Sequence, residues 1–252
     1  MPECPSAPDD CTPFALKKAR LVVKEQVVNR SHRSSAGIVV LTVAALLLLS
    51  LAACSPQRVP GVASTETGVP VLSKPVGGPG MKTIYVAGGC FWGTQKYLDQ
   101  IHGVTATEVG YANGASNSAT YGDGSGYAET VRVDYDPKVA PLPFLLRMFY
   151  LAIDPTSVDQ QGNDVGTEYR SGIYYTDPAD LAVIKASLAQ LQTQFSAPIA
   201  IETGPLKTYT AAEDYHQKYL VKNPDGYCHI PLNLFAQAAA ARPTTAELSA
   251  GK

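Results

Sequence analysis

The chain lacks the features that mark nucleic-acid-binding proteins and metal-cluster proteins. Its 20 basic and 22 acidic residues nearly cancel, which leaves a formal net charge of -2 at pH 7. So small a charge produces no field that would attract DNA, RNA or a strongly acidic protein. The 5 cysteines form no CxxC pair and are too few and too scattered for a disulfide-stapled small domain. We therefore expect no nucleic-acid partner and no bound metal.

Apolar residues are abundant, and their distribution divides the chain into regions. Hydrophobic residues make up 45% of the 252 positions, which suffices for one substantial core. We expect an N-terminal extension with a signal peptide at 1–53, a Pro/Gly-rich linker at 54–80, a folded domain at 81–235 and a low-complexity tail at 236–252. The linker has no apolar periodicity and cannot bury enough surface to offset the entropy lost on ordering, so it is typical of a tether.

The longest uncharged run, residues 34–53, indicates export. It follows the basic residues Arg30 and Arg33 and ends in LAAC at Cys54, which is the pattern of a secretory signal. The ending resembles a bacterial lipoprotein signal, in which the cysteine receives lipid and becomes the mature N-terminus. The alternative is an uncleaved membrane anchor, for which the run is long enough. Under both interpretations we expect the domain in the bacterial cell envelope, held on the membrane at its periplasmic or outer face.

Within the expected domain, the apolar pattern predicts strands and helices. Short β-branched runs closed by glycine or proline predict strands, and apolar residues at helical spacing predict helices. Asp177 as a cap and Pro178 at the first position are typical of a helix start. The β-α-β-β-α-β order predicts an α+β fold, a ferredoxin-like plait with a mixed or antiparallel sheet. The expected strands are 82–89, 104–114, 127–137, 170–176 and 200–206, and the expected helices are 91–103, 142–152, 177–195 and 210–223.

Cys90 stands where the first strand gives way to the first helix, directly behind Gly88 and Gly89. The unpaired N–H groups and the dipole of a helix N-terminus lower the pKa of a thiol placed there. This position makes Cys90 a candidate nucleophile with a lowered pKa. The alternative is a small buried hydrophobic residue, as most free cysteines are.

Phe91 and Trp92 follow Cys90 directly, and Trp92 is the only tryptophan in the chain. Adjacent residues on a helix point about 100° apart, so both can be buried only if the helix is covered nearly all round. Either both are core residues, or at least one of them walls an apolar slot beside the sulfur. Such a slot suits an uncharged group such as a thioether methyl.

Polar candidates for the same site lie in a strand and in a long loop. Glu129, near the start of a strand, is either on the solvent face or partly buried with a raised pKa that lets it lend a proton. Segment 154–175 is dense in Gly, Asn, Asp and Gln, and a polar loop of this length usually carries function or is disordered. It contains Asp164 and Tyr169, which together with Tyr121 are candidates to donate or orient hydrogen bonds.

Cys228 is the only other thiol within the expected domain. It is either structural or, because it lies on a terminal segment, able to meet Cys90 and form a disulfide. The histidines His102, His216 and His229 allow a thiol-dependent hydrolase as an alternative function, although no motif marks one of them as the base.

Five blocks of the sequence, in order, resemble the methionine sulfoxide reductase A family of peptide methionine-S-oxide reductases. Together they span the chain from Lys82 to about Ile230, and five ordered blocks do not arise by chance. The blocks are GGCFWG at 88–93, GYAETV at 126–131, IDPTS at 153–157, QGNDVGTEYRSGIYY at 161–175 and AEDYHQKYLVKNPDGYCHI at 212–230.

The resemblance implies a chemistry for Cys90 and its neighbours. Cys90 attacks the sulfoxide sulfur, while Glu129 protonates or hydrogen-bonds the oxygen with help from Tyr121 and Tyr169. Asp164 belongs to the hydrogen-bond network around the site. A sulfoxide oxygen is a poor leaving group unless it is protonated, so an acid beside the thiol is a physical requirement.

The resemblance also implies how the cycle closes. Oxygen transfer leaves Cys90 as a sulfenic acid and releases methionine, with Phe91 and Trp92 holding the substrate methyl. Cys228 then condenses with Cys90 to a disulfide, which a thioredoxin-type donor reduces. The implied role is protein repair after oxidative stress, with oxidised methionine-containing proteins or peptides as partners and no metal or organic cofactor. We expect a monomer.

Two features depart from the family pattern. Tyr127 stands where the family usually has histidine before the Ala-Glu pair, and several residues that are common after the site tyrosine are missing after Tyr121. No further cysteine or domain follows Cys228, so we expect neither a relay through a third thiol nor a second domain for the R epimer. A noncatalytic lipoprotein that binds oxidised partners remains an alternative function beside the hydrolase.

Overall fold

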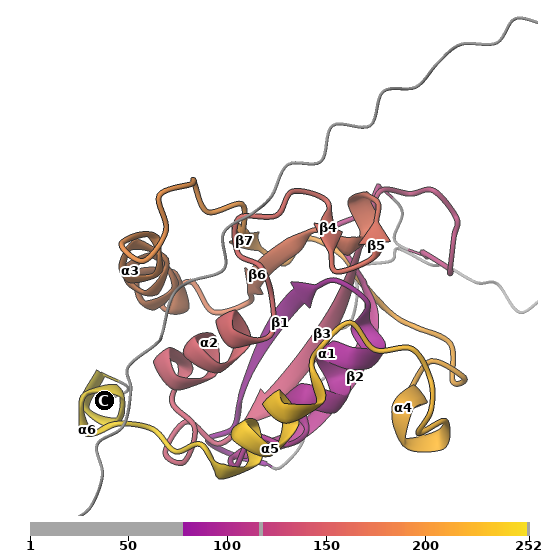
Figure 1. Cartoon of the computed structure of the whole chain (residues 1–252). Coiled ribbons are helices and arrows are strands. Elements are labelled where there is room, and N and C mark those ends of the chain that lie inside the picture. Colours follow the sequence, from indigo (N-terminus) through magenta and orange to yellow (C-terminus); the bar gives the residue numbers. More distant parts are fainter. Residues whose placement is uncertain (1–77, 116–117, 251–252) are drawn as a thin grey trace, which may run out of the picture. The chain divides into compact units, whose positions relative to one another are not determined.

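The structure is a computed structural model, which describes residues 78–115 and 118–250 (Figure 1). The predicted signal segment 1–53 and the lipidation candidate Cys54 lie outside the described residues, as does all but the end of the predicted linker 54–80. Within the described part of the chain, no helix is both long and apolar enough to cross a membrane.

A six-stranded sheet forms the framework of the domain. The strands lie in the order β7-β6-β1-β3-β2-β8, and every neighbouring pair is antiparallel except β6 and β7. The sheet is therefore mixed. Its strands are β1 (Lys82–Gly88), β2 (Val104–Ala112), β3 (Ala128–Tyr135), β6 (Ser171–Tyr175), β7 (Glu202–Pro205) and β8 (Tyr209–Ala211).

The central strands and two helices form the predicted plait. Helix α1 (Phe91–Leu98) follows β1, and helix α2 (Leu142–Leu151) follows β3. The order β6-β1-β3-β2 is the one that a β-α-β-β-α-β chain adopts when each helix crosses over one strand. Figure 1 shows both helices on the same face of the sheet. The expected α+β class and ferredoxin-like order are confirmed.

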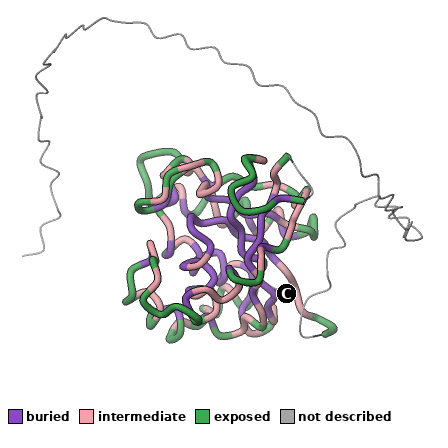
Figure 2. The backbone as a smooth tube through the Cα atoms, turned by 90° about the vertical axis from the view of Figure 1, so that its right-hand side faces the viewer, coloured by how far each residue is buried: buried purple, intermediate pink, exposed green. Residues whose placement is uncertain are grey.

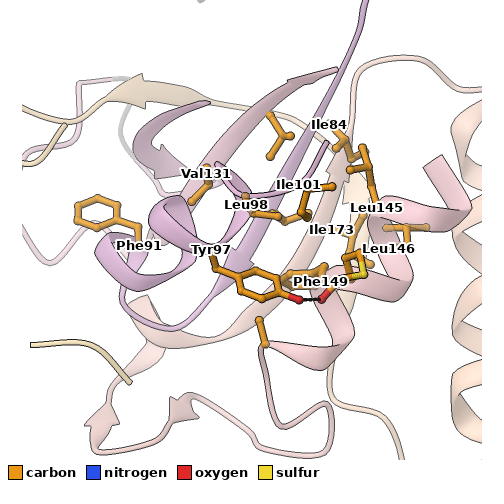
Figure 3. Close-up of a cluster of buried hydrophobic side chains, with 14 of the residues drawn as sticks. Ile84, Phe91, Tyr97, Leu98, Ile101, Val131, Leu145, Leu146, Phe149 and Ile173 are labelled. Carbon is orange, nitrogen blue, oxygen red and sulfur yellow. Dashed lines mark hydrogen bonds between the residues drawn. The ribbon is translucent and has the colours of Figure 1, made fainter. Parts of the chain in front are cut away.

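The main core lies between this face of the sheet and the helices. Figure 3 shows Tyr97 and Leu98 of α1 and Phe149 of α2 gathered with Ile84 and Val131 of the sheet, and each of these side chains is 2% exposed or less. Burial of one side chain of this kind contributes about 1.5–3 kcal/mol. The Tyr97 hydroxyl donates a hydrogen bond to a backbone carbonyl of α2 at 2.9 Å, so its polar end is satisfied.

The opposite face of the sheet is covered as well. Tyr85 and Tyr174 are buried there, with Leu206 and Tyr209 packed against them. Because both faces are covered, every residue of β3 is buried, including Glu129. Figure 2 shows the buried stretches of the backbone in purple in the interior, with exposed stretches in green around them. The sheet thus places a carboxyl group in the interior.

Helix α3 (Asp180–Gln192) begins later than the sequence predicts. The Asp177 carboxylate accepts a hydrogen bond from the backbone N–H of Ala179 at 3.0 Å, and the Asp177 carbonyl accepts one from Asp180 at 3.0 Å. Asp177 and Pro178 therefore belong to a turn that precedes the helix. The predicted helix is present, but its predicted cap is wrong.

The helix predicted at 210–223 is wrong for most of its length. Its N-terminal end belongs to strand β8, and only α4 (Tyr219–Lys222) is helical. The Gln217 side chain turns inward and bonds the backbone N–H and carbonyl of Val109 at 3.0 and 2.8 Å. Lys218 has a φ of 54°, in the left-handed region, which interrupts a helix. Tertiary hydrogen bonds have overridden the local helical pattern.

The folded chain continues past the expected domain end at Phe235. Helix α5 (Leu232–Ala240) runs through that position, and α6 (Thr245–Ala250) follows it. Arg147 of α2 pairs with Glu247 of α6 at 2.7 Å. The alanine-rich segment predicted to be a low-complexity tail is helical because alanine has the highest helix propensity, and Ala238 is buried in the main core.

Short elements in the polar loop are also absent from the sequence prediction. They are β4 (Gln160–Gln161), β5 (Asp164–Val165) and the single 3-10 turn η1 (Thr167–Tyr169). β4 and β5 pair as a small antiparallel ladder next to the main sheet. The loop is therefore structured and carries its polar side chains at fixed positions.

Candidate active site

The backbone places Cys90 at the start of α1. Gly89 turns the chain with a φ of +76°, and a Cβ atom there would lie 2.5 Å from the Gln161 side chain, so only glycine fits. Cys90 is the N-cap residue of the helix, and the backbone N–H groups of Trp92 and Gly93 face its sulfur. The thiol is free and 7% exposed. The predicted strand-turn-helix setting is confirmed.

The expected low pKa of Cys90 is wrong for the resting structure. Burial raises the pKa of the thiol above its ordinary value, and the nearby Glu129 carboxyl, when charged, raises it further. The N–H groups of Trp92 and Gly93 act in the opposite direction but are outweighed. The resting thiol is therefore protonated at neutral pH.

Glu129 lies on β3 as a buried acid close to the thiol. The residue is 2% exposed, and its Oε2 accepts a hydrogen bond from the backbone N–H of Phe91 at 2.9 Å. Burial raises the pKa of its carboxyl to about 8, against the opposing effect of this N–H group. Glu129 is therefore protonated at neutral pH and has a proton to give. Of the two interpretations of Glu129, the structure selects the buried acid.

The aromatic pair after Cys90 divides into a core residue and a half-buried one. Phe91 is 1% exposed and belongs to the main core. Trp92 stacks on Tyr219, with ring centroids 3.7 Å apart and 14° between the planes. Its Nε1 donates a hydrogen bond to Nδ1 of His216 at 2.9 Å, which fixes the plane of the indole. The role of either ring in holding a methyl group stays a prediction.

Tyr121 and Tyr169 approach the thiol and the acid from separate segments. Tyr121 is 52% exposed, and its side chain forms a hydrogen bond with that of Tyr169. Burial first, and then the charges of Glu129 and Cys90, raise the pKa of both phenols. Both tyrosines therefore keep their O–H protons and are able to donate hydrogen bonds at neutral pH.

Asp164, in β5, lies at the edge of the same group. Its Oδ2 accepts a hydrogen bond from the Tyr227 hydroxyl at 3.0 Å. Burial and this hydrogen bond raise the pKa of Tyr227 to about 12. Behind burial, the charge of Asp164 is also among the causes that raise the pKa of Cys90 and Glu129, so it is close enough to act on both.

Cys228, near the C-terminal end of the domain, lies close to the first turn of α1. Its thiol is free and half-buried, and its sulfur donates weakly to the Ile230 carbonyl at 3.5 Å. A Cβ atom at Gly93 would lie 2.9 Å from the Cys228 sulfur. The same Gly93 turns its N–H toward Cys90. Both cysteines thus lie near Gly93, and the disulfide between them stays a prediction.

Comparison with known proteins decides the family. The family model for peptide methionine sulfoxide reductase matches residues 82–247. The chain belongs to this family. A peptide methionine sulfoxide reductase MsrA from Lachnoclostridium phytofermentans is 56% identical over 153 residues, which are 59% of this chain and 92% of the relative. One from Clostridium perfringens is 52% identical over 157 residues, 61% of this chain and 100% of the relative.

Solved structures of the family have the same fold. The reduced form of Mxr1 from Saccharomyces cerevisiae is 38% identical, with a TM-score of 0.57 over 60% of this chain and 92% of that one. Methionine sulfoxide reductase A of Corynebacterium diphtheriae is 35% identical, with a TM-score of 0.54 over 62% of this chain and 85% of that one. The reductase described here is thus an oxidoreductase that reduces methionine sulfoxide. This decides against the hydrolase and against the noncatalytic binding protein.

Two further residues support the reductase site: Glu213, which the sequence analysis misses, and His216, which it names only as a possible base of a hydrolase. Glu213 accepts hydrogen bonds from the Tyr111 hydroxyl at 2.7 Å and from the backbone N–H of Tyr121 at 3.3 Å. His216 holds the indole of the neighbouring helix, as described above. Both lie in the block at 212–230 that resembles the family, and for Glu213 that block is the only signal the sequence offers.

Tyr127, where the reductase departs from its family pattern, braces the loop that carries Tyr121. Its hydroxyl accepts a hydrogen bond from the backbone N–H of Gly122 at 2.8 Å. The ring packs on Tyr111, with centroids 4.5 Å apart. Because Tyr127 immediately precedes β3, the shorter loop is tied directly to the strand that carries Glu129.

Proposed function

We propose that this reductase repairs methionine-S-sulfoxide in proteins after oxidative damage, with Cys90 as nucleophile and Glu129 as proton donor. One observation carries the assignment of roles. The buried Glu129 carboxyl is bonded at 2.9 Å to the backbone N–H of Phe91, the residue next to the cysteine. A carboxyl with a pKa of about 8 holds its proton at neutral pH, and its position beside the cysteine lets it give that proton to the sulfoxide oxygen.

The first half-reaction transfers oxygen from the substrate to Cys90. The Cys90 sulfur attacks the sulfoxide sulfur, Glu129 gives its proton to the oxygen, and the thiol proton takes the place of the one given. The hydroxyl then passes from the substrate sulfur to the Cys90 sulfur, and the bond between the two sulfurs breaks. The thioether leaves and Cys90 remains as a sulfenic acid. The hydroxyls of Tyr121 and Tyr169 donate hydrogen bonds to the same oxygen, while Trp92 holds the methyl group beside Phe91.

A protonated resting thiol fits this sequence of events. Ionisation of Cys90 at rest is opposed by burial and, when it is charged, by Glu129. Once a substrate oxygen accepts the Glu129 proton, positive character on the substrate sulfur draws the thiol sulfur forward. Proton transfer and attack therefore belong to one substrate-driven step, and Asp164 with Tyr227 orders the polar side of the site.

The second half-reaction returns the enzyme to its starting state. The Cys228 thiol condenses with the Cys90 sulfenic acid, so that an S–S bond forms, the S–O bond breaks and water leaves. A thioredoxin-type dithiol then reduces the disulfide and becomes oxidised itself. Because the envelope outside the cytosol is oxidising, we expect a membrane-fed, thioredoxin-like donor.

The proposal places the enzyme in the cell envelope as a monomeric lipoprotein anchored through Cys54. It is supported by the uncharged run at 34–53 with its LAAC ending. An uncleaved anchor is the competing arrangement. Mass spectrometry of the membrane-extracted protein distinguishes them: a lipid-modified Cys54 at the N-terminus is expected, whereas a mature chain that retains 34–53 contradicts the lipoprotein.

The reductase activity itself is tested with a peptide that contains both epimers of methionine sulfoxide. Incubation with the protein and dithiothreitol, followed by chromatography and mass spectrometry, should show loss of one oxygen mass from the S epimer alone. The R epimer in the same tube is the internal control. Equal consumption of both epimers contradicts the stereochemical assignment, and consumption of neither contradicts the function.

A further inference from the structure

The His229 side chain, next to Cys228, has two buried ring nitrogens. Neither makes a hydrogen bond of close geometry among the described residues, although the Gly88 backbone is near enough to act on the ring. A neutral imidazole carries one N–H donor and one acceptor lone pair. Buried polar atoms normally have partners, and an exception calls for a functional explanation.

The ring lies across the backbone of Cys90. A Cβ atom at Gly89 would lie 3.3 Å from Nε2 of His229, and one at Gly93 would lie 3.4 Å from Nδ1. The two nitrogens therefore face Gly89, directly before the nucleophile, and Gly93, three residues after it. Any side chain at either position would crowd the imidazole, so both glycines leave room for it.

The Cys228 sulfur also lies near Gly93. It would lie 2.9 Å from the same Gly93 Cβ position that Nδ1 of His229 approaches. The thiol and the imidazole nitrogen thus both approach Gly93, and at rest the thiol donates to the Ile230 carbonyl rather than to Nδ1. Gly162, whose Cβ atom would lie 3.1 Å from the His229 Cβ, closes the other side of the residue.

The charge states of the pair suit proton transfer from sulfur to nitrogen. Burial raises the pKa of the Cys228 thiol, with Lys96 and Asp164 acting on it in opposite directions, so the thiol is protonated at neutral pH. Burial lowers the pKa of His229, against opposing effects of Asp164 and the Gly88 backbone, so the imidazole is neutral. A thiol that must become a thiolate therefore lies beside an unprotonated base.

We propose that His229 is the general base of the disulfide-forming step. Nδ1 of His229 takes the proton from Cys228 as that sulfur attacks the sulfenic sulfur of Cys90. The S–S bond forms, the S–O bond breaks, and the imidazolium returns the proton to the departing hydroxyl, which leaves as water. This inference rests on the proposed function, because it requires the sulfenic acid at Cys90.

The test separates the two half-reactions in a single turnover. Reduced full-length protein is mixed with less than one equivalent of methionine sulfoxide, quenched in acid at intervals and alkylated. Methionine release reports the first half-reaction, and mass spectrometry of the peptides that carry Cys90 and Cys228 reports the disulfide. The variants are His229→Gln and His229→Asn, which place an amide near one or the other ring nitrogen, and exposed His102→Gln is the matched control.

Both His229 variants should release methionine at the normal rate but form the disulfide on the order of 10²-fold more slowly at pH 7. The deficit should shrink as the pH rises toward the thiol pKa, because Cys228 then ionises without a base. The His102→Gln control should behave as the wild type does. A packing role for His229 would slow disulfide formation equally at every pH.

Three results overturn the inference. They are an unchanged disulfide rate in both His229 variants, a deficit that does not depend on pH, and simultaneous loss of methionine release, which would make His229 a structural residue. Failure of the wild-type protein to release methionine, or to form a sulfenic acid at Cys90, would instead overturn the proposed function. The two failures are therefore distinguishable in one experiment.

Discussion

The two cysteines of the site are held in different ways. Cys90 lies between a strand and a helix, and the ladder of β1 with β3 and β6 fixes the backbone on one side of it. Cys228 lies on an irregular segment between α4 and α5, and its position depends on side-chain contacts with the first turn of α1. Regular backbone holds the residue that must meet the substrate. Irregular chain carries the sulfur that has to approach it afterwards.

The largest effects are expected for the two cysteines, each of which is needed in a different half-reaction. Cys90→Ser should reduce methionine formation by several orders of magnitude, because the nucleophile is gone. Cys228→Ser should still release one methionine per enzyme but should not turn over with a thioredoxin donor. Methionine released per enzyme, measured with and without the donor, checks both. Normal cycling by the Cys228 variant would remove that residue from the mechanism.

The next largest effect is expected for Glu129, the acid that acts with Cys90 but not with Cys228. Glu129→Gln should slow methionine release by about 10²–10³-fold and leave later disulfide formation unaffected. In the wild type the pKa of Glu129 is raised to about 8, so the carboxyl is protonated below that pH and loses its proton above it. Methionine release should therefore fall as the pH rises through about 8.

The Glu129 prediction carries its own control. Ionisation of the Cys90 thiol also increases with pH and would speed attack, so a fall in rate at high pH must come from the acid. The glutamine variant has no carboxyl and should show no fall. A decline of equal size in the variant would mean that another group supplies the proton.

A smaller effect is expected at Gly93, the residue that lies near both cysteines. Gly93→Ala places a methyl 2.9 Å from the Cys228 sulfur and 3.4 Å from the His229 ring, so both must shift. Displacements of this size cost about 10-fold in a step that depends on alignment. Disulfide formation should slow accordingly, while methionine release changes little. A variant slowed in methionine release alone would show that the methyl disturbs Cys90 instead.

The smallest effect is expected for α6, the C-terminal helix that follows Cys228 and α5. Arg147→Gln removes the ion pair with Glu247 that attaches α6 to α2. Arg147 is 43% exposed, so solvent screens the pair, and we expect the free energy of unfolding to fall by less than about 1 kcal/mol. Proteolysis after residue 240 should become faster, with turnover unchanged. Slower disulfide formation would show that this anchor positions Cys228.

Much of the structure around Cys90 follows from the local sequence pattern. The glycines before Cys90, the β-branched run before them and the helical spacing after them predict strand, turn and helix, and all three are present. Glu129 and the loop residues Asp164 and Tyr169 are found as candidates for the same reason, since their neighbours are patterned. The segment that leads to Cys228 could not be predicted in this way. Its sequence at 210–223 has a helical pattern, but the Gln217 side chain bonds to the backbone of β2 instead.

The sequence by itself determined the central strands and helices of the plait and the candidate residues of the site, because apolar period, glycine turns and residue type act over a few neighbouring positions. Only the tertiary structure decided the charge state of Cys90, the depth of Glu129 and the meeting of Cys228 with the turn at Gly93. Desolvation and charge act through space between segments far apart in the chain, so no local pattern records them.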